Sequence, residues 1–167
     1  QTRKSTSSAR IQNPHLKPRK PIPFLADLKQ LHDPEQALSF FHQYARMGFK
    51  HDYPSYACLL YKLARSRNFN QIDPILGIIK DRNIRCQESL FMGLMQHYGK
   101  CGLVEKAVEL FHQMPRFNCK RSLQSFNTLL NVLVANERFF DANDLFGRSK
   151  ELGLRPNAVS FNIMMKG

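Results

Sequence analysis

Residues 123–157 read LQSFNTLLNVLVANERFFDANDLFGRSKELGLRPN and decide the fold. An apolar stripe at helical spacing opens this stretch, formed by Phe126, Leu129, Leu130 and Leu133. A polar break at 135–138 separates it from a second stripe, and Gly153 follows that stripe where a left-handed helix end is expected. The stretch therefore predicts two short helices packed together, which are too small to bury both apolar faces alone.

The same unit recurs at intervals of 35 residues without a gap. The first-helix column is Tyr56, Phe91, Phe126 and Phe161. The second-helix column is Phe41, Leu76, Phe111 and Phe146. The closing turn carries Gly48, Asn83, Asn118 and Gly153, residue types that tolerate a positive φ. A basic column follows two positions later, at Lys50, Arg85, Lys120 and Arg155. A fixed period of this length predicts an all-α fold, an α-solenoid of helix-turn-helix repeats in which each repeat buries its stripes against its neighbours.

The period divides the chain into segments. We expect a basic N-terminal extension at 1–23, which its composition predicts to be disordered, and a degenerate capping repeat at 24–52. Three full repeats then cover 53–87, 88–122 and 123–157. Residues 158–167 begin a further, truncated repeat, so the parent protein is expected to be longer.

Charge points to a polyanionic partner. The 167 residues carry a net charge of +12, and 43% of them are hydrophobic, enough for a core. Nucleic acid is the favoured partner, and the alternative is a generically basic organellar protein. The sequence has no apolar run long enough for a transmembrane helix, so no membrane partner is expected.

The extension at 1–23 is rich in bases, Ser and Pro, and no acid precedes Asp27. Its bases are Arg3, Lys4, Arg10, Lys17, Arg19 and Lys20. An Arg- and Ser-rich, acid-poor composition is typical of an organellar targeting region. Two interpretations stay open: a basic arm that lies on RNA phosphates, and a solvated remnant of import.

Motifs for catalysis are absent from the sequence. It contains no phosphate-binding GxxxxGK[ST] or GxGxxG, no GxSxG elbow and no deaminase zinc signature. His97 and Cys101 share one helix face, but no second pair accompanies them as a structural metal site would require. We therefore predict no enzyme activity, no metal, no cofactor and no small-molecule substrate.

At this point a family resemblance is visible. The phrases SFNTLLNVL (125–133), AVELFHQM (107–114), GLRPN (153–157) and VSFNIMMKG (159–167) resemble the pentatricopeptide repeat consensus in register and length. The resemblance covers about residues 33–167, and uniform spacing is similar to the plain P-type subclass. It implies a plant organellar RNA-binding protein whose first helices line a concave surface.

The resemblance also implies which residues read RNA bases. Members of the family read a base with the fifth and last residues of a repeat, which in the third full repeat are Asn127 and Asn157. This pair resembles a pyrimidine reader that prefers cytosine over uracil. The truncated repeat presents Asn162 as a fifth residue and Val159 at the second position, where the family packs Val against a base.

The earlier repeats depart from the family pattern. Their fifth residues are Ala57 and Met92, which cannot hydrogen-bond a base edge. At the thirteenth position, where the family often places a phosphate-binding Lys, stand Arg65 and Lys100. Recognition of RNA bases is therefore expected to begin near Asn127. The preceding repeats are expected to recognise RNA by its shape and phosphates, or to dock a protein.

Two functions follow from these features. The first is a non-catalytic organellar RNA-binding protein that acts in RNA metabolism or translation, with a single-stranded transcript as partner. The second is a structural subunit of a large ribonucleoprotein such as the mitochondrial ribosome, bound to rRNA and neighbouring ribosomal proteins. The resemblance favours a mitochondrial location, with the chloroplast as the alternative.

Overall fold

The computed structural model describes residues 24–166, and within them every regular element is a helix. The α-helices are α1 Phe24–Gln30, α2 Pro34–Arg46, α3 Tyr53–Arg65, α4 Ile72–Asp81, α5 Glu88–Lys100, α6 Val104–Gln113, α7 Leu123–Ala135, α8 Phe139–Gly147 and α9 Ala158–Met164. Short 3-10 turns at Phe69–Gln71 and Met114–Phe117 precede α4 and follow α6. The predicted all-α class is confirmed.

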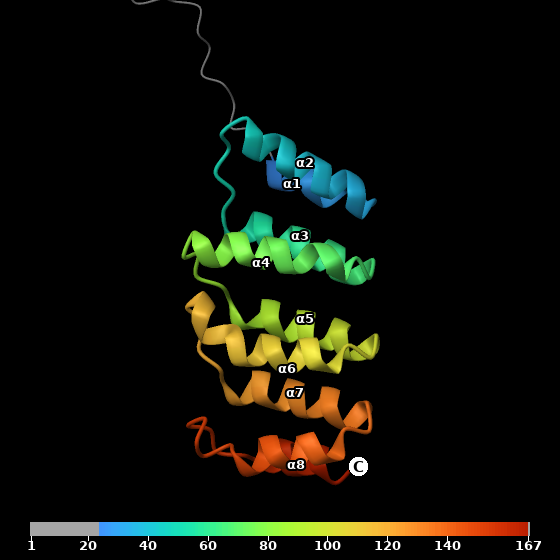
Figure 1. The fold of residues 1–167 in the computed structure, drawn as a ribbon, viewed down its shortest axis with the longest axis vertical. Coiled ribbons are helices and arrows are strands. Elements are labelled where there is room, and N and C mark those ends of the chain that lie inside the picture. The colour runs from blue at the N-terminus through green and yellow to red at the C-terminus, as the bar shows by residue number, and fades with distance from the viewer. Residues whose placement is uncertain (1–23, 167) are drawn as a thin grey trace, which may run out of the picture.

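The helices form two layers stacked along the long axis of the molecule (Figure 1). The first helices pack side by side in the order α1, α3, α5, α7 and α9. The second helices α4, α6 and α8 each contact the first helix of their own repeat. This arrangement is the predicted solenoid, in which a helix buries its stripe against its partner and against the next repeat.

The core consists of the columns that the period aligns. Tyr56, Phe91 and Phe126 are at most 1% exposed, and Leu129 is fully buried. Phe161 lies in the same column but is 54% exposed, because α9 is the last helix of the stack in the described residues. The stripe therefore becomes core where the second helix of its own repeat and the first helix of the next repeat cover it.

Helix ends follow local chemistry. The side chains of Asp33, Asp52, Ser122 and Asn157 accept hydrogen bonds from the backbone N–H groups that open α2, α3, α7 and α9. The expected positive φ is confirmed at Gly48, Asn83, Asn118 and Gly153. Positive φ also occurs at Arg67, Gly102 and Glu137, between the two helices of each repeat, where the sequence analysis did not expect it.

Two neighbouring closing turns, those of Asn83 and Asn118, are joined directly. The Asn118 Nδ2 donates to Asn83 Oδ1 at 2.8 Å, which links equivalent residues of two repeats. The Cys86 N–H donates to the Phe117 carbonyl oxygen at 3.1 Å. These bonds hold the turns in register along one edge of the stack. Within residues 24–166, no helix has the length and hydropathy needed to cross a membrane.

Candidate nucleic-acid interface

Two predicted base-reading residues meet on the first-helix face, the surface formed by α3, α5, α7 and α9. Asn127 lies in α7, and Asn157 is the N-cap residue of α9. The Ser160 hydroxyl donates to Asn127 Oδ1 at 2.7 Å, and Asn157 Oδ1 lies 3.2 Å from the same hydroxyl. One side chain therefore holds both amides of the repeat together, although 30 positions of sequence separate them.

The cap geometry orients Asn157. Its Oδ1 accepts the Ser160 N–H at 3.2 Å, while its own N–H donates to Ser160 Oγ. Both amide oxygens of the pair therefore face Ser160. Neither Nδ2 group has a protein partner within the described residues, and neither is a buried unpaired atom. The pair thus presents two N–H donor groups to solvent, where a ligand with two acceptors can bind.

The other residues of this predicted reader lie on α9. Val159 is 53% exposed and Asn162 is exposed, so both side chains are accessible. The equivalent residues of Val159 in the earlier repeats, Pro54, Ser89 and Gln124, are also exposed. Their accessibility agrees with a role in contacting RNA, and that role stays a prediction.

The face between α3 and α5 is occupied by a tyrosine. The Tyr61 hydroxyl donates to the Ser89 carbonyl oxygen at 3.1 Å. A Cβ on Gly93 would lie 2.7 Å from Tyr61 Cε1, so the ring crosses α5 where that helix has no side chain. Sequence reasoning missed this contact; a glycine inside an otherwise regular helix was the available signal. Next to it, Ala57 is buried and offers no polar atom to a base.

Glu88 places a carboxylate between α5 and α7. Its Oε1 accepts the Ser122 N–H at 2.9 Å and the Ser125 N–H at 3.3 Å, so it caps the start of α7. Partial burial raises the pKa of Glu88, but hydrogen bonds from Ser125 and Ser122 outweigh that effect and hold the pKa below its usual value. An ionised carboxylate offers a base edge acceptors only, and one oxygen of Glu88 is already engaged with α7.

The predicted phosphate contacts stand at the C-terminal ends of first helices. Arg65 ends α3 and Lys100 ends α5; both are exposed, and neither forms a salt bridge within the described residues. Lys100 also lines a hollow of about 420 Å³ between α5 and α7. Its other polar lining residues are Gln96, Thr128, Asn131 and Asn136. An ammonium group among amides and a hydroxyl suits the backbone of a nucleic acid, and sequence reasoning did not identify these amides.

The six bases of the N-terminal extension lie outside the described residues. Over 24–166, no group of three or more His, Cys, Asp or Glu side chains is arranged to hold a metal ion. The polar groups that the described contacts place on the first-helix face include amides, hydroxyls and single charges. Such groups bind and position a ligand through hydrogen bonds and charge.

Comparison with known proteins identifies relatives of this architecture. Residues 89–133 and 121–167 match the PPR repeat family. The chain is 55% identical over 159 residues to a mitochondrial pentatricopeptide repeat-containing protein of Arabidopsis thaliana, covering 95% of this chain and 35% of that protein. It is 38% identical over 122 residues to a second mitochondrial member from the same plant, covering 71% of this chain and 23% of that one. The chain therefore spans about a third or less of the length of these relatives.

Solved structures show the same fold. The pentatricopeptide repeat protein PPR10 from maize superposes with a TM-score of 0.71 at 23% identity, over 85% of this chain and 21% of that one. PPR10 has also been solved in complex with an 18-nt psaJ RNA element. The PPR domain of protein-only RNase P 1 from Arabidopsis thaliana, in complex with tRNA, gives a TM-score of 0.60 at 19% identity, over 85% of this chain and 75% of that one. These two neighbours share the helical solenoid and were solved with RNA.

Proposed function

This chain belongs to the pentatricopeptide repeat family, and on that premise we propose that it is a non-catalytic RNA-binding protein that acts in organellar RNA metabolism or translation. The proposal assigns Asn127 and Asn157 to one base of a single-stranded RNA. The observation that carries it is the shared hydrogen-bonding of both amide oxygens to Ser160, which leaves the Nδ2 groups of both residues without a protein partner in the described part of the chain. Structural neighbours solved with RNA support the class of partner.

The donor pair accounts for a preference for cytosine. Cytosine presents two adjacent acceptors, N3 and O2, on its pairing edge, whereas uracil carries an N–H between its two carbonyl oxygens. Two amide N–H groups therefore match cytosine, and one of them would meet a donor on uracil. Single-stranded RNA leaves this edge free for recognition, so the proposed ligand is unpaired RNA.

Other residues of the face contact the RNA backbone or a neighbouring base in this proposal. Lys100 and Arg65 attract phosphates at the C-terminal ends of α5 and α3, and Val159 contacts the face of a base. Asn162 serves as the fifth residue of the next reader. We propose a mitochondrial location, which is supported by the named location of the relative that is 55% identical.

A second function is favoured by the face between α3 and α7. There Tyr61 bonds to Ser89, Ala57 is buried, and Glu88 is engaged in capping α7, so base-edge readers are missing from two successive repeats. A structural subunit of a mitochondrial ribonucleoprotein, held by rRNA backbone and protein neighbours, needs no such readers. In that case Asn157 would serve as a helix cap alone.

Selection of RNA ligands from a random pool by the intact protein tests the proposal. We expect the selected RNAs to share a short unpaired segment with cytosine enriched at one position. Recovery of RNAs without a common position, together with co-sedimentation with a ribosomal subunit, would instead support the structural role.

A further inference from the structure

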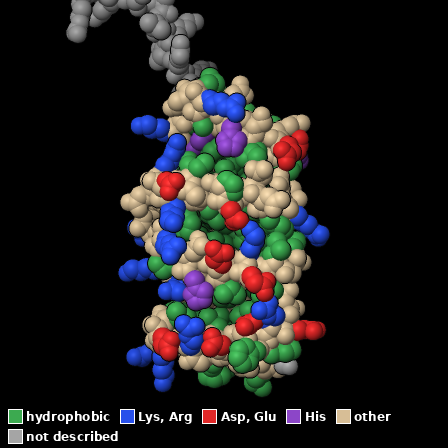
Figure 2. All heavy atoms as spheres, in the orientation of Figure 1, with side chains coloured by type: hydrophobic (Ala, Val, Ile, Leu, Met, Phe, Trp, Pro, Cys, Tyr) green, Lys and Arg blue, Asp and Glu red, His purple; other side chains and the backbone are tan. Residues whose placement is uncertain are grey.

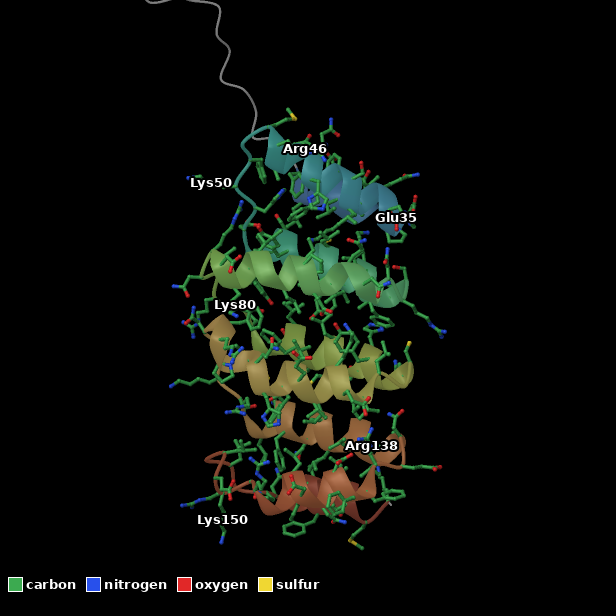
Figure 3. All side chains as sticks on the ribbon, viewed as in Figure 1. Glu35, Arg46, Lys50, Lys80, Arg138 and Lys150 are labelled. Carbon is green, nitrogen blue, oxygen red and sulfur yellow. The ribbon has the colours of Figure 1, made fainter. Side chains whose placement is uncertain are left out.

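A dense row of bases lines the edge where each second helix turns into the next first helix. We call this surface the turn edge. It comprises Arg46, Lys50, Lys80, Arg82, Arg85, Arg116, Lys120, Arg121, Arg148, Lys150 and Arg155. Lys and Arg side chains project along this edge in the space-filling view (Figure 2), and Lys50, Lys80 and Lys150 mark it in Figure 3, opposite Glu35 and Arg138. The acids on or beside the same turns are Asp52, Asp81, Glu88 and Glu151.

The bases of the turn edge recur at equivalent positions of successive repeats, and two of the neighbouring turns are bonded together. The column Lys50, Arg85, Lys120 and Arg155 follows the left-handed turn of each repeat by two residues. The hydrogen bond from Asn118 to Asn83 joins neighbouring turns, and the Cys86 bond to Phe117 joins the segments beside them. Because directly packed helices lie about 8–10 Å apart, the column forms a regular array with roughly that spacing.

The array is largely unneutralised. Two bases away from this edge are paired: Lys106 bonds to Asp73 of the preceding repeat at 2.6 Å, and Arg138 bonds to Glu105 of the preceding repeat and to Asp141 of its own. On the turn edge, Arg148 has acidic partners, and the other bases form no salt bridge within the described residues. Like charges held this close repel one another, so an added polyanion relieves an existing cost.

A hollow of about 1140 Å³ lies within the turn edge. Arg85, Lys120 and Arg121 line it, together with Asn118 and Glu88. The Glu88 carboxylate is already bonded to two backbone N–H groups of α7, which offsets its charge. The Arg121 guanidinium lies 5.3 Å from the centre of the Phe111 ring, which orients it. The hollow therefore gathers three bases around a space large enough for more than one phosphate.

We propose that the turn edge is a second RNA-binding surface, which docks the phosphate backbone of a double-helical RNA segment. The proposal rests on RNA being the partner of this protein, as argued above. A duplex is preferred to a single strand because two amides on this edge, Asn83 and Asn118, bond to each other, and the Phe117 ring is buried away from any base. A rigid row of charges also matches the fixed phosphate array of an A-form helix.

A pair of matched triple variants of the intact protein tests the surface. The edge variant carries Arg85→Gln, Lys120→Gln and Arg155→Gln. The control variant carries Lys29→Gln, Arg67→Gln and Lys166→Gln, which remove the same charge from exposed positions away from the turn edge. Binding of an RNA hairpin whose stem is fully paired is measured as a function of salt. We expect the edge variant to make the slope of log affinity against log salt shallower by about 2–3, while the control changes it little.

The outcomes separate this proposal from base reading. Equal slopes for the two variants would overturn it, because net charge rather than the turn edge would then govern binding. Hairpin binding that is unchanged in the edge variant would also overturn it. If an acidic protein co-purifies with the wild type and not with the edge variant, the turn edge is a protein-docking surface instead. Failure of the wild type to select a sequence from a random pool would count against base reading, while the hairpin slopes would still decide the role of the turn edge.

Discussion

In the capping repeat, the burial of the His51 ring depends on its protonation state. The residue is 5% exposed, and its ring stacks on Phe41 with centroids 3.5 Å apart. Nε2 lies 2.9 Å from the Phe41 carbonyl oxygen, to which it donates, while Nδ1 has no partner in the described residues. The neutral ring therefore fits this site, and a second proton on Nδ1 would be buried without an acceptor.

Acidification should destabilise the capping repeat through this histidine. Burial lowers the pKa of His51, although the hydrogen bond to Phe41 acts in the opposite direction. The unfolded chain, with a histidine pKa of about 6.5, then binds more protons than the folded chain below that pH. The stabilisation is complete above about pH 6.5 and is lost as the pH falls, at no more than about 1.4 kcal/mol per pH unit from this residue.

Thermal unfolding at about pH 7.5 and about pH 5.5 measures the effect. We expect the wild type to lose more stability between these values than a His51→Phe variant, whose ring cannot titrate. His97 and His112 also have lowered pKa values because of burial and nearby bases. The wild type and the His51→Phe variant both retain these two histidines, so their effect cancels in the comparison. An identical loss in wild type and variant would show that His51 does not contribute.

At the scale of the helix, close contact between first helices depends on glycine. A Cβ on Gly99 of α5 would lie 2.8 Å and 2.9 Å from the two methyl carbons of Val132 on α7. Val132 is itself buried at 6% exposure, so it has little room to move. Gly77 of α4 has no atom within 4 Å of the same hypothetical carbon. A larger residue at Gly99 would therefore clash with α7, whereas a larger residue at Gly77 would meet no neighbour.

Alanine substitutions at the two glycines should change stability in opposite directions. We expect Gly99→Ala to lower the free energy of unfolding by roughly 1–3 kcal/mol, because the methyl group overpacks the contact between α5 and α7. Gly77→Ala should raise it by about 0.5–1 kcal/mol through helix propensity. Chemical denaturation of both variants measures the difference, and an increase for both would mean that α5 and α7 do not pack this closely.

The helices and the positive-φ closing turns could be predicted from sequence, because a fixed period aligns residues whose roles depend on local backbone and burial. The contacts of Tyr61 and Glu88 were missed, since they depend on how side chains cross to a neighbouring helix, and only Gly93 in α5 gave a sign of the first. Left-handed backbone at Arg67 and Glu137 was also missed, because neither residue type signals it. Their alignment with Gly102 at the repeat interval was the available clue.

Part of the interface was accessible to the same reasoning. The resemblance paired Asn127 with Asn157, but it gave no role to Ser160, whose hydroxyl bonds to both. That role depends on Asn157 acting as an N-cap, which brings the third residue of α9 back toward α7. The reading function of the pair stays a proposal, whereas its geometry is a property of the fold.

At the scale of the whole molecule, a net charge of +12 should make RNA affinity strongly dependent on salt. We expect affinity to fall steeply as salt increases, because each neutralised phosphate releases bound counterions. Deleting residues 1–20 removes six bases and should make this slope shallower without changing the preferred RNA sequence. Filter binding across a salt series measures both, and an affinity independent of salt would contradict phosphate binding.

The most direct test of base reading is RNA selection by an Asn157→Asp variant of the intact protein. Asp is also a good N-cap, so the variant retains the bond to the Ser160 N–H and should fold. It replaces an N–H donor with an acceptor, which matches the N3–H of uracil. Asn143→Asp, at an exposed position of α8, is the matched control, since it adds the same charge away from the interface.

We expect the Asn157→Asp variant to shift from cytosine toward uracil at one RNA position, by about 1–3 kcal/mol, with little change in overall affinity for the backbone. The Asn143→Asp control should select the same RNAs as wild type. If Asn157→Asp also selects the wild-type sequences, Asn157 is a helix cap alone, and the account of base reading is contradicted.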